Sequence, residues 1–130
     1  MPIEVKIFKE DQLLLSSFVQ EVTNYEMISS YEKLMKTNEF FTVNKELVDM
    51  RDCSLADISK EAFLSLSSLV ESYLNEKYLD FKTAIVAPED LSYGLSKLYE
   101  SYSEHSPETI MVFREAKDAL EWLGVPELKI

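Results

Sequence analysis

Glycine, cysteine and histidine are scarce in this 130-residue chain, which contains two glycines, one cysteine and one histidine. With only Gly94 and Gly124, neither a glycine-rich dinucleotide fingerprint nor a P-loop can be written on the sequence. Cys53 alone excludes an internal disulfide and a thiolate-based structural zinc site, and His105 alone excludes a two-histidine metal site. We therefore expect the protein to need no metal and no nucleotide cofactor.

Positive charge is also scarce, because 13 lysines and arginines stand against 24 aspartates and glutamates and give a formal net charge of −11. Binding to nucleic acid or to an anionic membrane requires clustered lysine and arginine, and here the cations are spread thinly along the chain. Residues 1–10 lack the features of a signal peptide, and no apolar run approaches the length of a membrane span. The sequence predicts a cytoplasmic protein with no nucleic-acid partner and no membrane insertion.

Apolar side chains are plentiful, since 46% of the residues are hydrophobic and 12% are aromatic. A chain of this length suits one compact domain that buries roughly two-thirds of its unfolded surface. No linker, internal repeat or low-complexity segment interrupts it. Residues 1–130 are therefore predicted to form a single domain.

Hydrophobic periodicity predicts nine elements. Residues 3–8 and 12–22 read as two strands of an antiparallel hairpin, and Thr23 and Glu26 have the spacing of a capping box that begins a helix over 24–37. Further strands are expected at 46–51, 82–87 and 109–113, with helices at 59–77, 91–102 and 116–123, the first of these capped by Ser59 and the last ended by Gly124. The order ββαβαβαβα predicts an α/β mixed sheet with helical cover, in which the helical crossovers give parallel strands.

Ligands of open α/β sheets bind at the carboxyl ends of the strands, where the loops after Met50, Ala87 and Phe113 should converge. The candidate binding residues there are Arg51, Asp52, Ser54, Ser92, Tyr93 and Arg114. In an acidic chain, two arginines at one crevice suit an anionic ligand or an acidic segment. The alternative is that each arginine pairs with a neighbouring carboxylate, such as Asp49 or Glu115.

Other conspicuous residues have structural explanations, and no catalytic residue is predicted. Glu89 and Asp90 stand where a helix begins, so the helix dipole and unpaired backbone donors account for them. Cys53 has no nearby base and is interpreted as a small structural residue, and His105 as a solvated loop residue. Trp122 neighbours apolar positions of the last helix, which predicts a packing role.

Three segments carry a resemblance to a known group: Leu-Val-Asp-Met-Arg-Asp at 47–52, Ala-Ile-Val-Ala-Pro-Glu-Asp-Leu-Ser-Tyr-Gly-Leu-Ser-Lys-Leu-Tyr at 84–99, and Val-Phe-Arg-Glu-Ala-Lys-Asp-Ala-Leu-Glu-Trp-Leu-Gly at 112–124. With them the chain resembles the small bacterial SpoIIAA-like proteins of the STAS/SEC14-like group. The resemblance implies a STAS-like mixed sheet. Anti-sigma-factor antagonists of this class carry a phosphorylatable serine in an Asp-Ser-x-Gly motif, whereas residues 52–55 here interpose Cys53 and lack the glycine. The SEC14 analogy implies an apolar ligand cavity, which no sequence feature demonstrates.

Two functional hypotheses follow. The first is a non-enzymatic regulatory module that binds a protein partner or associates with itself. The alternative is a binding protein for a small anionic or apolar ligand, or an enzyme, that uses the strand-end loops near Arg51, Ser92 and Arg114. A deep polar pocket at those loops would favour the alternative.

Overall fold

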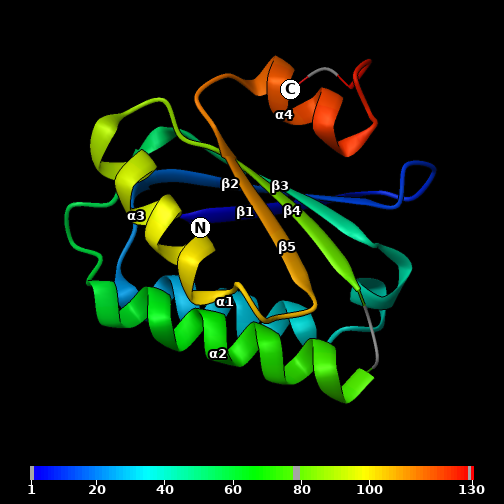
Figure 1. Ribbon diagram of the computed structural model, residues 1–130, viewed down its shortest axis with the longest axis horizontal. Coiled ribbons are helices and arrows are strands. Elements are labelled where there is room, and N and C mark those ends of the chain that lie inside the picture. The colour runs from blue at the N-terminus through cyan, green and yellow to red at the C-terminus, as the bar shows by residue number, and fades with distance from the viewer. Residues whose placement is uncertain (1, 78–79, 129) are drawn as a thin grey trace.

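A computed structural model describes residues 2–77, 80–128 and 130 of the chain (Figure 1). Its strands are β1 Ile3–Phe8, β2 Leu13–Glu21, β3 Lys45–Ser54, β4 Phe81–Val86 and β5 Glu108–Phe113. Its α-helices are α1 Asn24–Met35, α2 Lys60–Lys77, α3 Asp90–Tyr102 and α4 Ala116–Leu123. The predicted order ββαβαβαβα is confirmed, with one short 3₁₀ helix, η1 Asn38–Thr42, that the sequence did not indicate.

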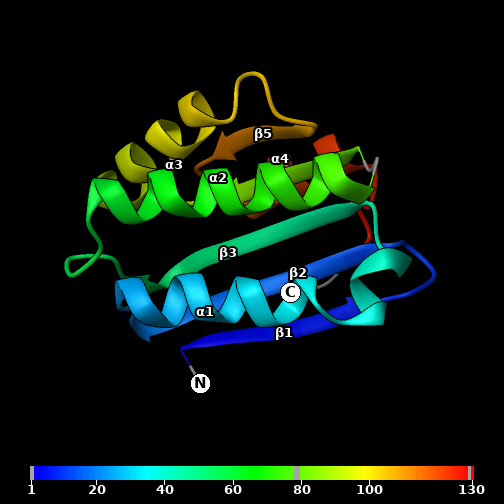
Figure 2. The ribbon, with the colours of Figure 1, turned by 90° about the horizontal axis from the view of Figure 1, so that it is seen from below.

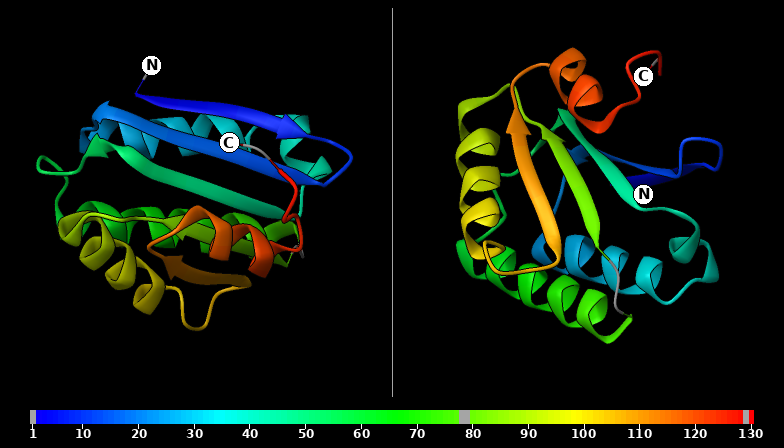
Figure 3. Two further views of the ribbon diagram at one scale, coloured as in Figure 1. Left: turned by 90° about the horizontal axis from the view of Figure 1, so that it is seen from above. Right: turned by 45° about the vertical axis from the view of Figure 1, so that its right-hand side comes forward.

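The five strands form one mixed sheet in the order β1-β2-β3-β4-β5. Strands β1 and β2 pair antiparallel, and every later neighbour is parallel, as helical crossovers require. Helices α1, α2 and α3 cover one face of the sheet, and α4 lies alone on the other (Figures 1 and 2). Figure 3 shows β1 and β5 at the two edges of the sheet.

The predicted helix ends are made by the expected local hydrogen bonds. The Thr23 hydroxyl accepts from the Glu26 backbone N–H at 3.2 Å, and the Glu26 carboxylate accepts from the Thr23 N–H at 3.0 Å, so the capping box at α1 is confirmed. The Ser59 hydroxyl accepts from the backbone N–H of Ala62 at 3.1 Å before α2. Gly124 ends α4 with φ of 80°, a left-handed conformation that suits glycine.

Strand β3 is longer than predicted, because it continues to Ser54 instead of ending at residue 51. Ser17 pairs with Asp49 and Val19 with Asp52, so β3 has one more residue than β2 between these pairs. Such a bulge lets the two strands resume pairing as far as Glu21 and Ser54. The assignment of Asp52 and Ser54 to a loop was therefore wrong, since periodicity alone does not report a bulge.

Two hydrophobic clusters lie on opposite faces of the sheet. The larger one fills the space between the sheet and helices α1, α2 and α3. The smaller one lies beneath α4 and includes Leu13, Leu47 and Leu120. Trp122 is half-buried at its margin, with its ring centroid 5.9 Å from that of Phe113. Its position in the structure agrees with the predicted packing role.

Candidate functional site

The structure brings four of the six predicted site residues to one open groove at the carboxyl ends of β2 and β3. This groove is lined by Gln20, Glu21, Arg51, Asp52, Cys53, Ser54, Leu55, Glu89, Leu91 and Ser92. Tyr93 and Arg114 are not among its lining residues. Ser92 is itself buried, and its hydroxyl donates to the Glu89 carbonyl at 3.1 Å, so it presents little to a ligand.

Both candidate arginines are held by carboxylates of their own chain. Arg51 donates from Nε to Asp49 Oδ1 at 2.9 Å and from Nη2 to Asp49 Oδ2 at 2.8 Å, a bidentate pair. Burial raises the pKa of Asp49, but its hydrogen bonds from Arg51 outweigh burial and the pKa falls below its usual value. Asp49 is the alternative partner that the sequence offered for Arg51, and the structure contains that pair.

Arg114 pairs with Asp90, not with Glu115, the partner that the sequence suggested. Its Nη1 donates to Asp90 Oδ1 at 2.9 Å and to the Pro88 carbonyl at 2.8 Å, and its guanidinium lies 4.0 Å above the ring of Tyr93. These contacts tie the loop after β5 to the start of α3. Arg114 and Tyr93 therefore form one stack beside the groove.

The remaining conspicuous residues show no sign of catalytic or metal-binding chemistry in the described part of the chain. Burial raises the pKa of the Cys53 thiol to about 11, with Asp49 and Asp52 adding to the effect, so the thiolate is scarce at neutral pH. The Glu89 side chain makes no cap hydrogen bond to α3, so the capping explanation for it was wrong. His105 is exposed in a turn. Within residues 2–77, 80–128 and 130, no three histidine, cysteine, aspartate or glutamate side chains gather as a metal site would need.

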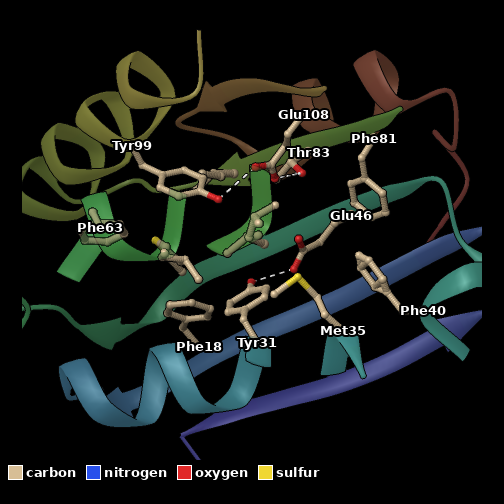
Figure 4. Close-up of a pocket in the computed structure, with 15 residues that line it drawn as sticks. Phe18, Tyr31, Met35, Phe40, Glu46, Phe63, Phe81, Thr83, Tyr99 and Glu108 are labelled. Atoms are coloured by element: carbon tan, nitrogen blue, oxygen red, sulfur yellow. Dashed lines mark hydrogen bonds between the residues drawn. The ribbon is translucent and has the colours of Figure 1, made fainter. Parts of the chain in front are cut away.

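A second candidate site lies inside the molecule, in a cavity between the sheet and helices α1, α2 and α3 (Figure 4). The space open to the centre of a water molecule is about 30 Å³. At roughly 10–15 Å³ for each water, it has room for two or three waters or for a molecule of about two non-hydrogen atoms. Its lining is largely apolar and includes the aromatic side chains of Phe18, Tyr31, Phe40, Phe63, Phe81 and Tyr99.

Two buried carboxyl groups, Glu46 and Glu108, line this cavity from strands β3 and β5. Glu46 Oε2 accepts from Ser16 Oγ at 2.6 Å and from the Tyr31 hydroxyl at 2.7 Å. The Glu46 carboxyl is thus held by a hydroxyl from the neighbouring strand β2 and by a tyrosine from helix α1.

The Glu108 cluster repeats this construction with a different use of the oxygens. Thr83 Oγ1 donates to Glu108 Oε2 at 2.6 Å, and the Tyr99 hydroxyl donates to Oε1 at 3.0 Å. Both oxygens of Glu108 are therefore occupied. Glu46 differs, because both of its donors bind Oε2, and Figure 4 shows the other oxygen directed into the cavity.

Burial changes the acidity of both carboxyl groups. Burial foremost, with a smaller contribution from the charge of Glu108, raises the pKa of Glu46 to about 7, although hydrogen bonds from Ser16 and Tyr31 oppose the rise. The pKa of Glu108 is raised by burial and lowered in part by Thr83 and Tyr99. Among the described residues that line the cavity, none is a lysine or an arginine. Glu46 therefore exchanges its proton near neutral pH without a cation beside it.

The SEC14 analogy implied an apolar ligand cavity, but neither of its two carboxyl groups was predicted from the sequence. One signal was present: Glu46 is two and four residues from Val48 and Met50, and all three side chains are buried in the larger cluster or its cavity. A carboxyl on the apolar face of a strand is directed into the core, because alternate residues of a strand share a face. Tyr31 and Tyr99, which donate to these carboxyls, lie on the helices that precede β3 and β5, and periodicity within one element does not report such contacts between elements.

Comparison with known proteins bears on the fold alone. No protein-family model and no curated protein sequence matches the chain. A solved structure does: an uncharacterized protein of the DUF3478 family from Shewanella loihica PV-4, described as having a SpoIIAA-like fold, superposes with a TM-score of 0.52 at 19% sequence identity. The match covers 93% of this chain and 91% of the other. Separately, none of the helices in the described part of the chain is long and apolar enough to cross a membrane. The fold implied by the resemblance is confirmed: the chain has a SpoIIAA-like fold.

Proposed function

We propose that the protein is a non-enzymatic binding domain whose ligand is a small organic ammonium ion held in the cavity between the sheet and helices α1, α2 and α3. The single observation that carries the proposal is the second oxygen of Glu46, Oε1, which accepts no hydrogen bond from the described residues and faces an aromatic-lined space. An ammonium group in that space gains a charge-assisted hydrogen bond to this oxygen.

The lining favours a cation over a neutral molecule. An ammonium group is attracted to the faces of aromatic rings, and a set of such rings around a carboxylate is a common way to recognise alkylated amines. The cavity offers six aromatic side chains and two carboxyl groups, with no basic side chain among its described lining residues to compete. A compact alkylammonium therefore matches the cavity in charge, apolar surface and size.

The ionisation of Glu46 makes this binding dependent on pH. The raised pKa of about 7 means that the carboxyl is mostly neutral at pH 6 and mostly ionised at pH 8. An ammonium ion binds the ionised form, so affinity rises with pH until Glu46 is fully ionised. Below pH 7 the change is at most about tenfold per pH unit, since one proton is released per ligand bound.

The test uses methylammonium and methanol, which have two non-hydrogen atoms each and differ in charge. Met35 and Met50 line the cavity, whereas Met111 is 43% exposed on strand β5. In methyl-¹³C-methionine NMR spectra, we expect methylammonium to shift Met35 and Met50 saturably and to leave Met111 unmoved. Methanol should bind at least about tenfold more weakly, because it lacks the charge that Glu46 and the rings recognise.

Two variants sharpen this experiment. Glu46→Gln should remove the preference for the ammonium ion and its pH dependence, whereas Glu121→Gln, which neutralises an exposed carboxyl on α4, should change neither. Equal binding of the two probes would show that the cavity accepts small molecules but does not select cations. No shift of Met35 or Met50 with either probe would refute binding in the cavity altogether.

A protein partner at the strand-end groove stays a prediction of the sequence. Leu91 is 54% exposed there among charged side chains, but the guanidinium of Arg51 is already engaged by Asp49. The cavity has the more specific chemistry, so we place the proposed function there.

A further inference from the structure

Strand β1 leaves one edge of the sheet unpaired, and its backbone groups at that edge can be assigned. The Val19 N–H donates to the Pro2 carbonyl at 2.7 Å, which makes Pro2 and Val19 a hydrogen-bonded pair of the β1–β2 ladder. Bonded and non-bonded pairs alternate in an antiparallel ladder. The backbone groups of Glu4 and Lys6 therefore point toward β2, and those at positions 3, 5 and 7 point outward. In Figures 2 and 3 none of the described helices or strands covers that side of β1.

The sequence of this edge suits pairing with an antiparallel second copy, because its apolar residues are symmetric about Val5 and its two charges are opposite. Residues 3–7 read Ile-Glu-Val-Lys-Ile, so a second copy that runs antiparallel about Val5 places Glu4 opposite Lys6 on both sides. In this register, Val5 pairs with Val5 of the second copy, and Ile3 with Ile7, through the outward-facing backbone groups. Glu4 and Lys6 then form the non-bonded pairs, in which opposed side chains approach most closely.

Neighbouring two-fold registers are worse. A two-fold axis at Glu4 brings two glutamates face to face, and an axis at Lys6 brings two lysines face to face, both of which are destabilising. A charged edge strand ordinarily prevents sheet edges from joining. Here the two charges are opposite in sign and two residues apart, so they favour the register centred on Val5 and disfavour the two registers next to it.

The surface beside β1 is also apolar where a second copy would lie. A groove between β1 and α1 is lined by Pro2, Ile3, Glu4, Val5, Tyr25, Glu26, Ser29, Ser30, Lys33, Leu34 and Thr37. Val5 is 44% exposed and Tyr25 is 78% exposed. Across the same two-fold axis, two antiparallel copies of α1 bring Glu26 of one toward Lys33 of the other, with the small Ser29 and Ser30 between them.

We propose that the protein forms a symmetric dimer in which β1 pairs with β1 of a second copy, antiparallel and centred on Val5. The two five-stranded sheets then become one continuous sheet. Glu4 and Lys6 specify the register, and neither makes an ion pair within the described part of the chain. The dimer does not depend on the cavity, which lies on the inner side of the helical layer.

The test is sedimentation velocity over a range of protein concentrations at about 0.15 M salt, where surface charges more than ~8 Å apart are screened. Wild-type protein should convert from monomer to dimer as its concentration rises. Glu4→Lys and Lys6→Glu each place like charges in both cross-strand pairs, so each should weaken dimerisation at least tenfold. Glu10→Lys and Lys9→Glu make the same charge changes in the exposed turn after β1 and should leave the dimer intact.

A mixture of the two single variants gives the decisive test of the register. The Glu4→Lys and Lys6→Glu chains repel copies of themselves, but each pair in the mixed dimer has opposite charges, so an equimolar mixture should dimerise again. The double variant Glu4→Lys with Lys6→Glu should also dimerise. Wild-type protein that stays monomeric up to about 1 mM, or single variants that behave like their turn controls, would overturn the proposal. So would a mixture of folded variants that stays monomeric.

Discussion

Replacement of Glu46 by glutamine tests whether a carboxyl group near neutrality is buried in this core. The glutamine side chain would keep an acceptor for the hydroxyls of Ser16 and Tyr31, which lie 2.6 and 2.7 Å from Glu46 Oε2. Its amide nitrogen would occupy the position of the free oxygen in the cavity. The substitution therefore preserves shape and hydrogen bonds while it removes one titration.

The pKa of Glu46 determines how the free energy of unfolding of the wild-type protein changes with pH. Burial raises this pKa from 4.5 to about 7, so between these pH values the native state keeps a proton that the unfolded chain has lost. The free energy of unfolding then falls as pH rises, by about 1.4 kcal/mol per pH unit and about 3 kcal/mol in total, and levels off above pH 7. The raised pKa of Glu108 acts in the same direction.

Urea denaturation between about pH 5 and pH 8.5 measures this difference directly. The free energy of unfolding of Glu46→Gln should not fall between pH 5 and pH 7 as that of the wild-type protein does, because the variant has no buried charge to form. At pH 8 it should therefore exceed the wild-type value by about 2–3 kcal/mol. The exposed control Glu121→Gln should track the wild-type curve. A wild-type stability that is flat or rises from pH 5 to pH 7, or a glutamine variant that is less stable at pH 8, would refute the reasoning.

Three further predictions concern packing, reactivity and cofactors. Trp122→Ala should lower the free energy of unfolding by about 2 kcal/mol in urea denaturation, less than the loss of a fully buried ring would. The half-buried Trp122 ring packs on Phe113, and the Lys82 ammonium lies 4.2 Å from its centroid. Unchanged stability would contradict this. Cys53 should react with iodoacetamide at pH 8 at least tenfold more slowly than free cysteine, because its pKa is raised to about 11 by burial, and an equal rate would show that the thiol is accessible and ionised. The Tm should not respond to EDTA, divalent metals or ATP in a thermal scan, and a rise of several degrees with a metal or with ATP would reveal a site that the sequence does not show.

Hydrophobic patterning was enough to find every strand and α-helix, because the α-helices bury one apolar face and the central strand β4 is a short, largely apolar run buried on both faces. The Thr23 capping box and Gly124 also fixed two helix ends, since their backbone geometry is local. What the periodicity missed depends on pairing between strands. The bulge that carries β3 on to Ser54 exists because β2 and β3 regain register after Ser17, and no local pattern reports that.

The candidate site was only partly readable from the sequence. The strand-end rule correctly brought Arg51, Asp52, Ser54 and Ser92 to one groove, because parallel strands end at the same edge of the sheet. The same rule did not predict that Arg114 forms an ion pair with Asp90, 24 positions earlier in the chain. Choice among carboxylates for an arginine depends on tertiary distance, and in a chain with an excess of acidic residues several partners compete.

The two buried carboxyl clusters show why Glu46, and not Glu108, is the residue on which function depends in our proposal. A buried carboxyl lowers stability relative to an apolar side chain of the same size, so its presence calls for a compensating interaction. Glu108 has that compensation within the fold, because Thr83 and Tyr99 occupy both of its oxygens. Among the described residues, Glu46 has compensation for one oxygen only, and the other faces a space with room for a molecule of about two non-hydrogen atoms. Two clusters of similar construction thus differ at one atom, and that atom is where a ligand can gain free energy that the fold itself leaves unused.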